Sequence, residues 1–204
     1  MKFRKTNTYA IFKQCVPDYS WQSVLDFGGN RGNLLDGEIN VKKYTCLDIS
    51  KEGLDALPNN VKSIHWNRHH SYYNPNGNAH EPFPKIPWHD IVFANSVFTH
   101  HILDEALYCI RHLSKYTNRI VFTYIDPTNN TFLEKFRDKY YDLNFDGGDV
   151  SYTRDEKGIL WSAFDTEHLK SQLDHHHVET GTTDWFNYMD IRVRPETALG
   201  IVGY

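Results

Sequence analysis

SVLDFGGNRGN, residues 23 to 33, is the stretch that decides the fold of this chain. It predicts a short apolar strand that contains Asp26 and runs into a turn with Gly28, Gly29 and Gly32. Glycine allows a positive φ, and it lets a ligand approach main-chain N–H groups with no Cβ in the way. The pattern therefore predicts a ligand-binding turn at the end of a strand.

A second predicted strand, residues 44–47, also ends in an acid, Asp48, sixteen positions after Gly32. In nucleotide-binding α/β folds an acid in this place hydrogen-bonds the ribose hydroxyls. The two strands and their acids together predict a nucleoside site.

Composition limits the classes of partner. The 22 Lys and Arg against 26 Asp and Glu give a net charge of −4, which provides no general attraction to nucleic acid or to an anionic membrane, so we expect neither as a partner. No apolar run is long enough for a membrane span or a signal peptide, so we expect a soluble, cytoplasmic protein. Cys15, Cys46 and Cys109 lack a CxxC spacing, and we expect no disulfide and no zinc.

Short apolar runs alternate with helical patterns along the chain. Helices are predicted at 51–57, after the N-cap Ser50, and at 103–113, where apolar residues recur every three or four positions. This alternation predicts an α/β fold with a parallel sheet, and we expect a single domain over residues 1–204. The predicted parallel strands are 24–27, 44–47, 63–66, 91–95 and 120–125.

The remaining segments give weaker patterns. Residues 1–20 are expected to form a helix or a lid, and the segment 68–88 has no helical or strand period but is rich in aromatic residues and proline. Loops longer than about 12 to 15 residues are uncommon unless they serve a site, so we expect 68–88 to wall the pocket at the carboxyl ends of the strands. Further helices are predicted at 132–141 and 166–173, and final strands near 178–185 and 198–204.

The residues around the glycine turn distinguish between three kinds of ligand. A phosphate loop would need GxxxxGK, and no lysine stands at that spacing. A dinucleotide fingerprint has no acid before its first glycine, whereas Asp26 precedes Gly28. A carboxylate there repels a pyrophosphate but attracts an ammonium or a sulfonium, which points to S-adenosylmethionine.

These residues resemble the class I S-adenosylmethionine-dependent methyltransferases. VLDFGGNRG is similar to the family's first motif, an acid followed by three alternate glycines, with Asp26, Gly28 and Gly32 in place and Asn30 instead of the middle glycine. Asparagine tolerates the left-handed conformation better than other residues with a side chain, so the turn is expected to form. Asp48 matches the family's second motif.

The resemblance covers roughly residues 20–185 and implies a Rossmann-like three-layer sandwich, with a mostly parallel seven-stranded sheet and an antiparallel last strand. In the fourth-strand segment HDIVFANSVFTHH, Asp90 opens the strand and Asn95, Ser96 and Thr99 match the polar positions after it. The family's acid after the third strand is absent. The residues implied to bind S-adenosylmethionine are Asp26, Gly28, Gly29, Asn30, Gly32, Asp48, Ile49, Asn67, Arg68, Asn95 and Ser96.

Histidines follow the fourth strand, where the resemblance places the acceptor. A neutral imidazole can take a proton from a hydroxyl or an amine, so His100 and, after it, His101 are the catalytic candidates. A histidine base predicts a rate that falls below about pH 6.5. The alternative is that Thr99 caps the next helix and the histidines lie at its solvated end.

Other histidines carry less information. The run 175–177 is expected to be solvated surface. His65, His69, His70 and His80 surround the aromatic loop, and their spacing leaves a metal site open, although the sequence-based prediction is that no metal binds.

The acceptor is less defined than the cofactor. The motifs that accompany nucleobase-amine or cytosine C5 methylation are missing after the fourth strand, as are the convergent carboxylates of metal-assisted catechol methylation. We therefore expect methyl transfer, largely by positioning, to an O, N or S atom of a small metabolite or a short peptide. Two alternatives stay open: a non-catalytic protein that binds S-adenosylmethionine or S-adenosylhomocysteine as a partner or sensor, and an NAD-binding oxidoreductase.

Overall fold

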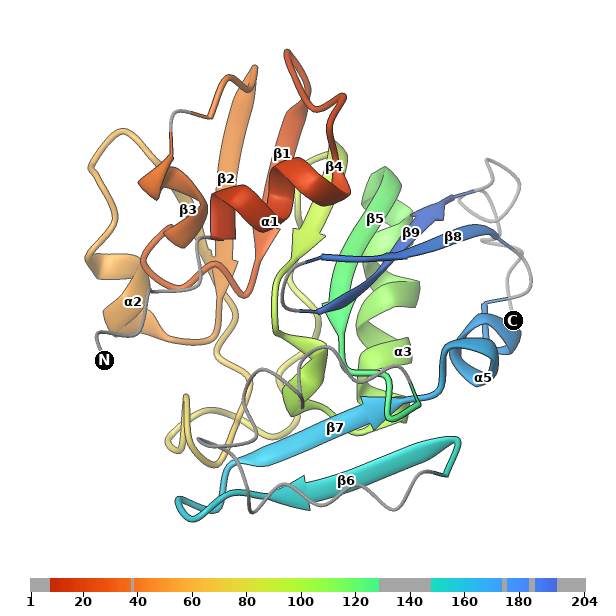
Figure 1. Ribbon diagram of the computed structural model, residues 1–204. Helices are drawn as coiled ribbons and strands as arrows, with labels where there is room; N and C mark the ends of the chain where they lie inside the picture. Colours follow the sequence, from red (N-terminus) through yellow and green to blue (C-terminus); the bar gives the residue numbers. More distant parts are fainter. Residues whose placement is uncertain (1–7, 38, 129–147, 174–175, 184–185, 194–204) are drawn as a thin grey trace, which may run out of the picture.

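The computed structural model describes residues 8–37, 39–128, 148–173, 176–183 and 186–193. A seven-stranded sheet with strand order β3-β2-β1-β4-β5-β9-β8 forms its centre (Figure 1). Strands β1 to β5 pair in parallel, and β9 runs antiparallel to both β5 and β8. The predicted mostly parallel sheet with an antiparallel last strand is confirmed. The bounds are β1 Ser23–Phe27, β2 Lys43–Asp48, β3 Lys62–His65, β4 His89–Ala94, β5 Thr117–Tyr124, β8 His177–Thr182 and β9 Asn187–Arg192.

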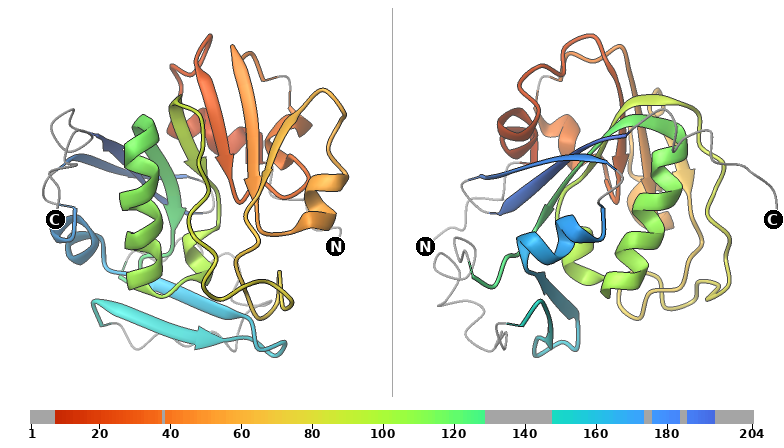
Figure 2. Two further views of the ribbon diagram at one scale, coloured as in Figure 1. Left: turned by 180° about the vertical axis from the view of Figure 1, so that it is seen from behind. Right: turned by 90° about the vertical axis from the view of Figure 1, so that its right-hand side faces the viewer.

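Helices cover both faces of the sheet and make three layers (Figure 2). In β4, Phe93 packs against Phe12 of α1, while Val92 and Ala94 belong to the core under Ile110 of α3. A strand buried on both faces reads as a continuous apolar run, which is why β4 was predictable. The helices are α1 Thr8–Cys15, α2 Lys51–Asp55, α3 Leu103–Leu113 and α5 Thr166–Ser171, with short 3₁₀ turns η1 Asn33–Asp36, η2 Phe98–His100 and η3 Ser114–Tyr116.

Most local predictions agree with these elements. The helix predicted at 103–113 is α3, and Ser50 caps α2 by accepting a hydrogen bond from the Gly53 amide. Thr99 is not the N-cap of α3, because Ile102 occupies that position and the Thr99 hydroxyl instead donates to the Ser96 carbonyl within the η2 turn. The helix predicted at 132–141 and the strand predicted at 198–204 lie outside the described residues.

A two-stranded hairpin was not predicted. Strands β6 Val150–Arg154 and β7 Leu160–Phe164 pair with each other and form a separate sheet that lies across the carboxyl ends of the parallel strands (Figure 1). Ser162 Oγ donates to the His101 carbonyl at 2.6 Å, and the Leu103 amide donates to the Tyr152 hydroxyl at 2.8 Å. The hairpin therefore closes one side of the edge at which the glycine turn lies.

The strand predicted near 178–185 is β8 at 177–182. The sequence did not predict β9 at 187–192, which pairs with β8 in antiparallel fashion. Among the helices of the described ranges, none combines the length and the apolar character needed to cross a bilayer.

Candidate functional site

The glycine turn leaves β1 with three residues in the left-handed region. Gly28, Asn30 and Gly32 have φ of +73°, +51° and +79°, so Asn30 does adopt the conformation that the middle glycine of the motif would have. Its side chain fits because Gly53 of α2 has none: a Cβ on Gly53 would lie 2.3 Å from Asn30 Oδ1. The replacement in the motif is therefore matched by a glycine on the neighbouring helix.

Asp26 lies beneath this turn and is only 2% exposed. Its Oδ2 accepts a hydrogen bond from the Tyr44 hydroxyl at 2.6 Å, and a Cβ on Gly29 would lie 2.5 Å from the same oxygen. Burial raises the pKa of Asp26 to about 7; the Tyr44 hydrogen bond opposes this, and the nearby Asp48 adds to it. A cation brought above the turn would favour the ionised form.

Asp48 ends β2 beside the turn. Its Oδ2 accepts from the Asn30 amide at 2.7 Å and its Oδ1 from the Ser50 amide at 2.6 Å. Burial raises its pKa, and the backbone hydrogen bonds oppose that rise. A carboxylate oxygen can accept more than one hydrogen bond, so the two adjacent oxygens of Asp48 can also accept from a vicinal diol such as that of a ribose.

The end of β4 approaches the same turn. Ser96 has a φ of +56°, and its amide donates to Thr123 Oγ1 at 2.7 Å, while the Thr123 hydroxyl donates to Asn95 Oδ1 at 3.2 Å. The following residue, Val97, packs on the turn so closely that a Cβ on Gly28 would lie 2.4 Å from Val97 Cγ2. The structure thus brings the predicted residues of β1, β2 and β4 to one edge of the sheet.

A cavity of about 220 Å³ adjoins this edge. Three segments form its walls: the loop that begins at Trp66, the η2 and α3 segment, and the hairpin, which contributes Arg154 and Leu160. Ile49, the residue after Asp48, also lines the cavity, so the cavity lies next to Asp48. Four residues singled out from the sequence line it, namely Ile49, Arg68, His100 and His101.

His100 is held in one tautomer. Its Nδ1 lies 2.8 Å from the Leu160 carbonyl, so this nitrogen carries the proton and Nε2 keeps a lone pair. The Tyr73 and Trp161 rings lie 5.7 and 4.6 Å from its ring. Burial lowers the pKa of His100 to about 4, against the opposing hydrogen bond to Leu160. This pKa lies below the ordinary imidazole value near 6.5 that a general-base role for His100 would assume, because the imidazole is buried among aromatic rings.

His101 and His70 are neutral for the same reason. His101 Nδ1 lies 2.9 Å from the Val97 carbonyl, and His70 Nδ1 accepts from the Tyr72 and Tyr73 amides, each at 3.2 Å. Burial lowers the pKa of both imidazoles. Across the part of the chain that the structure describes, no three His, Cys, Asp or Glu side chains group so that they could hold a metal ion.

The aromatic loop divides into two parts. Its first residues, from Arg68 to Ser71, line the cavity, whereas Phe83 packs on Trp66 and Phe27 with ring centroids 4.9 and 6.2 Å apart. The Asn67 amide oxygen accepts from Asn74 Nδ2 at 3.2 Å, so its side chain stabilises the loop itself. The loop is therefore both a wall of the cavity and a cover for the core.

Sequence reasoning missed the hairpin residues of the cavity, Arg154 and Leu160. A signal was present, because two runs rich in strand-forming residues flank a turn that contains Gly158 with a φ of +73°. Reading that pattern as a hairpin would have placed a third wall beside the histidines.

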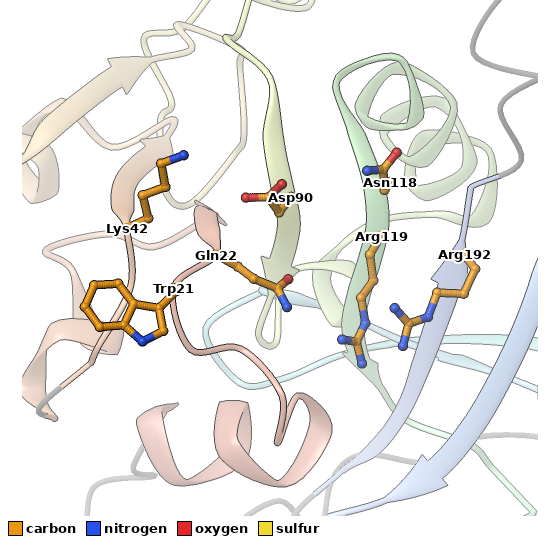
Figure 3. Close-up of a pocket in the computed structure, with 7 residues that line it drawn as sticks. All are labelled: Trp21, Gln22, Lys42, Asp90, Asn118, Arg119 and Arg192. Carbon is orange, nitrogen blue, oxygen red and sulfur yellow. The ribbon is translucent and has the colours of Figure 1, made fainter.

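A larger cavity of about 430 Å³ lies at the opposite edge, at the amino ends of the strands (Figure 3). Its charged groups are engaged with protein partners: Arg119 pairs with Asp190 at 2.7 Å and with Asp18 at 2.8 Å, and Asp90 accepts from the Ser23 amide and hydroxyl, both at 2.7 Å. Volume alone would select this cavity, but its buried Arg119 is held in ion pairs, and four of the residues predicted from the sequence to bind the cofactor or the acceptor line the smaller cavity.

No family model and no curated protein matches the sequence. Solved structures do match the fold. Magnesium protoporphyrin IX methyltransferase (ChlM) from Synechocystis PCC 6803 with bound SAH is 13% identical over 90% of this chain and 78% of that chain, with a TM-score of 0.52. The DhpI-SAH complex is 13% identical over 92% and 84%, with a TM-score of 0.55. The pyocyanin biosynthetic protein PhzM is 13% identical over 92% and 55%, with a TM-score of 0.60.

Proposed function

We propose that this protein, which has the fold of the class I S-adenosylmethionine-dependent methyltransferases, binds S-adenosylmethionine at its glycine turn and transfers the methyl group to an O, N or S atom of a small metabolite or short peptide. The observation that carries the proposal is the placement of the Asp48 carboxylate, whose two oxygens accept from the Asn30 and Ser50 amides beside a turn of left-handed residues. The neighbours with bound SAH share this fold and support the choice of cofactor.

Bound S-adenosylmethionine would supply a methyl group already activated on a sulfonium. The residues of this chain would bind and orient it. Asp48 would accept hydrogen bonds from both ribose hydroxyls, and Gly28 would let the ligand approach the main chain. Asp26, buried under the turn, would favour a positively charged ligand in its ionised form.

His100 and His101 would face the acceptor. Each imidazole donates from Nδ1 to a backbone carbonyl, which leaves Nε2 as a hydrogen-bond acceptor for the acceptor's hydroxyl, amine or thiol. With a pKa of about 4, His100 is a weak base, so we assign it to positioning, and the proton released by the acceptor leaves to water. Holding the two reactants in line supplies much of the rate.

Calorimetry with S-adenosylmethionine, S-adenosylhomocysteine and NAD tests the binding step. We expect the first two to bind and NAD not to bind, and Gly28→Val to abolish binding. Gly158→Val is the matched control, because Gly158 has the same φ of +73° but nothing within 4 Å of a Cβ. Binding of NAD alone would contradict the proposal, and binding without turnover of any acceptor would favour the non-catalytic alternative.

A further inference from the structure

Arg68 places a positive charge in the wall of the cavity beside the glycine turn. It is half-buried and forms no ion pair with any Asp or Glu of the described ranges. Burial raises the pKa of Cys109 and lowers that of His101; Glu105 raises both values and Arg68 lowers both, so the charges of Glu105 and Arg68 both reach the cavity. Cys109 and His101 both line the cavity.

The other charged groups around the cavity leave it positive. Arg154 of the hairpin lines it, is exposed, and donates to the Gly158 carbonyl at 2.7 Å. Glu105, in the first turn of α3, is the carboxylate of the lining and is exposed. His70, His100 and His101 are uncharged at neutral pH because burial lowers their pKa values. The charged residues that line the cavity are therefore two cations, Arg68 and Arg154, and one carboxylate, Glu105.

Size and wall chemistry restrict the ligand further. A volume of about 220 Å³ lies below the roughly 300 to 1,000 Å³ typical of pockets for drug-sized ligands. Trp66 and Tyr108 are among the walls, and Trp66 Nε1 is a buried donor without an acceptor in the described structure. These walls suit a compact, flat molecule with at least one strong hydrogen-bond acceptor.

We propose that this cavity binds the methyl acceptor and that the acceptor carries an anionic group, a carboxylate or a phosphoryl, bound by Arg68. The guanidinium fork matches either group with two parallel hydrogen bonds. The Nε2 atoms of His100 and His101 then accept from the hydroxyl, amine or thiol at the other end of the same molecule. This inference rests on the proposed methyl transfer and names the class of its acceptor.

Ligand-observed NMR titration with three probes tests the charge preference: benzoate, its neutral isostere benzamide, and phenyl phosphate. The titrations are run on the whole chain with and without S-adenosylhomocysteine. We expect benzoate or phenyl phosphate to bind at least about tenfold more tightly than benzamide, because one charge-assisted bidentate contact separates them. The two anions decide between a carboxylate and a phosphoryl group.

Variants assign the preference to Arg68. Arg68→Gln should remove it, and Arg68→Lys should keep part of it, whereas Arg111→Gln, which removes an exposed charge from α3 outside the cavity, should leave it unchanged. Equal affinity for benzoate and benzamide, failure of all three probes to bind, or an anion preference that survives Arg68→Gln would each overturn the proposal. A chain that prefers anions but binds no S-adenosylhomocysteine would instead contradict the proposed function alone.

Discussion

At the amino ends of the parallel strands, buried Arg119 donates to both oxygens of Asp190 and to Asp18, whereas at the carboxyl ends buried Asp26 accepts a hydrogen bond from the neutral Tyr44 hydroxyl. The pKa values differ accordingly: the hydrogen bond from Arg119 holds that of Asp18 below its ordinary value, while burial raises that of Asp26 to about 7.

The buried charges of Arg119 and Asp190 therefore form an ion pair at the amino ends of the strands. At the carboxyl ends, the buried carboxyl group of Asp26 is less well compensated. Arg119 and Arg192 extend toward each other from β5 and β9 in Figure 3, and both lie near Asp190. A network of ion pairs contributes to folding, whereas a buried charged group with little compensation lowers stability and is typical of a ligand-binding site. The following variants test this difference between the two edges of the sheet.

Removing Arg119 from its ion pairs should have the largest effect on stability. Arg119→Met leaves Asp190, which is 3% exposed, as a buried charge without its main partner, so the free energy of unfolding should fall by about 3 to 5 kcal/mol. Urea denaturation at pH 7 measures the loss. Arg192→Met is the control, because its guanidinium is 45% exposed and 3.5 Å from Asp190, and it should cost less than about 1 kcal/mol. Similar losses in both variants would contradict the contrast.

Removing the buried charge of Asp26 should have the opposite effect and raise the free energy of unfolding. In the folded protein, burial raises the pKa of Asp26 from 3.8 to about 7, so ionisation of this group makes the protein less stable as the pH rises from about 4 to 7. Asp26→Asn should therefore raise the free energy of unfolding at pH 8 by up to about 4 kcal/mol and leave it nearly unchanged at pH 4.

Denaturation at both pH values checks this result. Asp90→Asn is the matched control, because hydrogen bonds from Ser23 lower the pKa of Asp90, so its removal should decrease stability at pH 8. Asp26→Asn should also weaken the binding of S-adenosylhomocysteine. A variant that is less stable at pH 8 than the unchanged protein would show that Asp26 is compensated after all.

Replacing Asp48 should weaken binding of the cofactor. Asp48→Asn replaces one of two acceptor oxygens by a donor, so affinity for S-adenosylhomocysteine should fall by about 1 to 3 kcal/mol, or roughly 5- to 150-fold. Calorimetry measures this loss. Glu52→Gln, an exposed acid four positions further along on α2, should bind normally. Unchanged affinity in a folded Asp48→Asn variant would place the ligand elsewhere.

The smallest effect is expected at His100. Because burial lowers its pKa to about 4, turnover should stay flat between about pH 5.5 and 8, and His100→Gln should lower kcat by less than about tenfold. Affinity for S-adenosylhomocysteine should not change. His80→Gln, an exposed histidine of the aromatic loop, serves as the control. A rate that falls below pH 6.5, together with a loss of 100-fold or more, would instead make His100 a general base.

Some elements were predictable because one local cause decides them. The three- and four-residue spacing of apolar side chains gave α3 its observed bounds, and the Ser50 hydroxyl fixed the start of α2. The hairpin of β6 and β7 was missed because its docking depends on contacts such as Ser162 to His101, sixty-one positions apart. Thr99 was misread because its hydroxyl bonds back to Ser96 and not forward to a helix.

The glycine turn and its two acids could be predicted from local sequence. Gly28, Gly32 and the asparagine between them favour left-handed backbone conformations after β1, and the spacing to Asp48 predicts a second acid at the same edge. The backbone conformation of the turn follows from residues close together in the chain.

The protonation state of His100 and the shape of the smaller cavity depend instead on the tertiary structure. His100 is neutral because Trp161 and Leu160, sixty positions further on, bury it, and Arg68 reaches a cavity that the hairpin closes. Protonation depends on burial and on neighbouring charges, and these come from segments that the sequence does not show to be close.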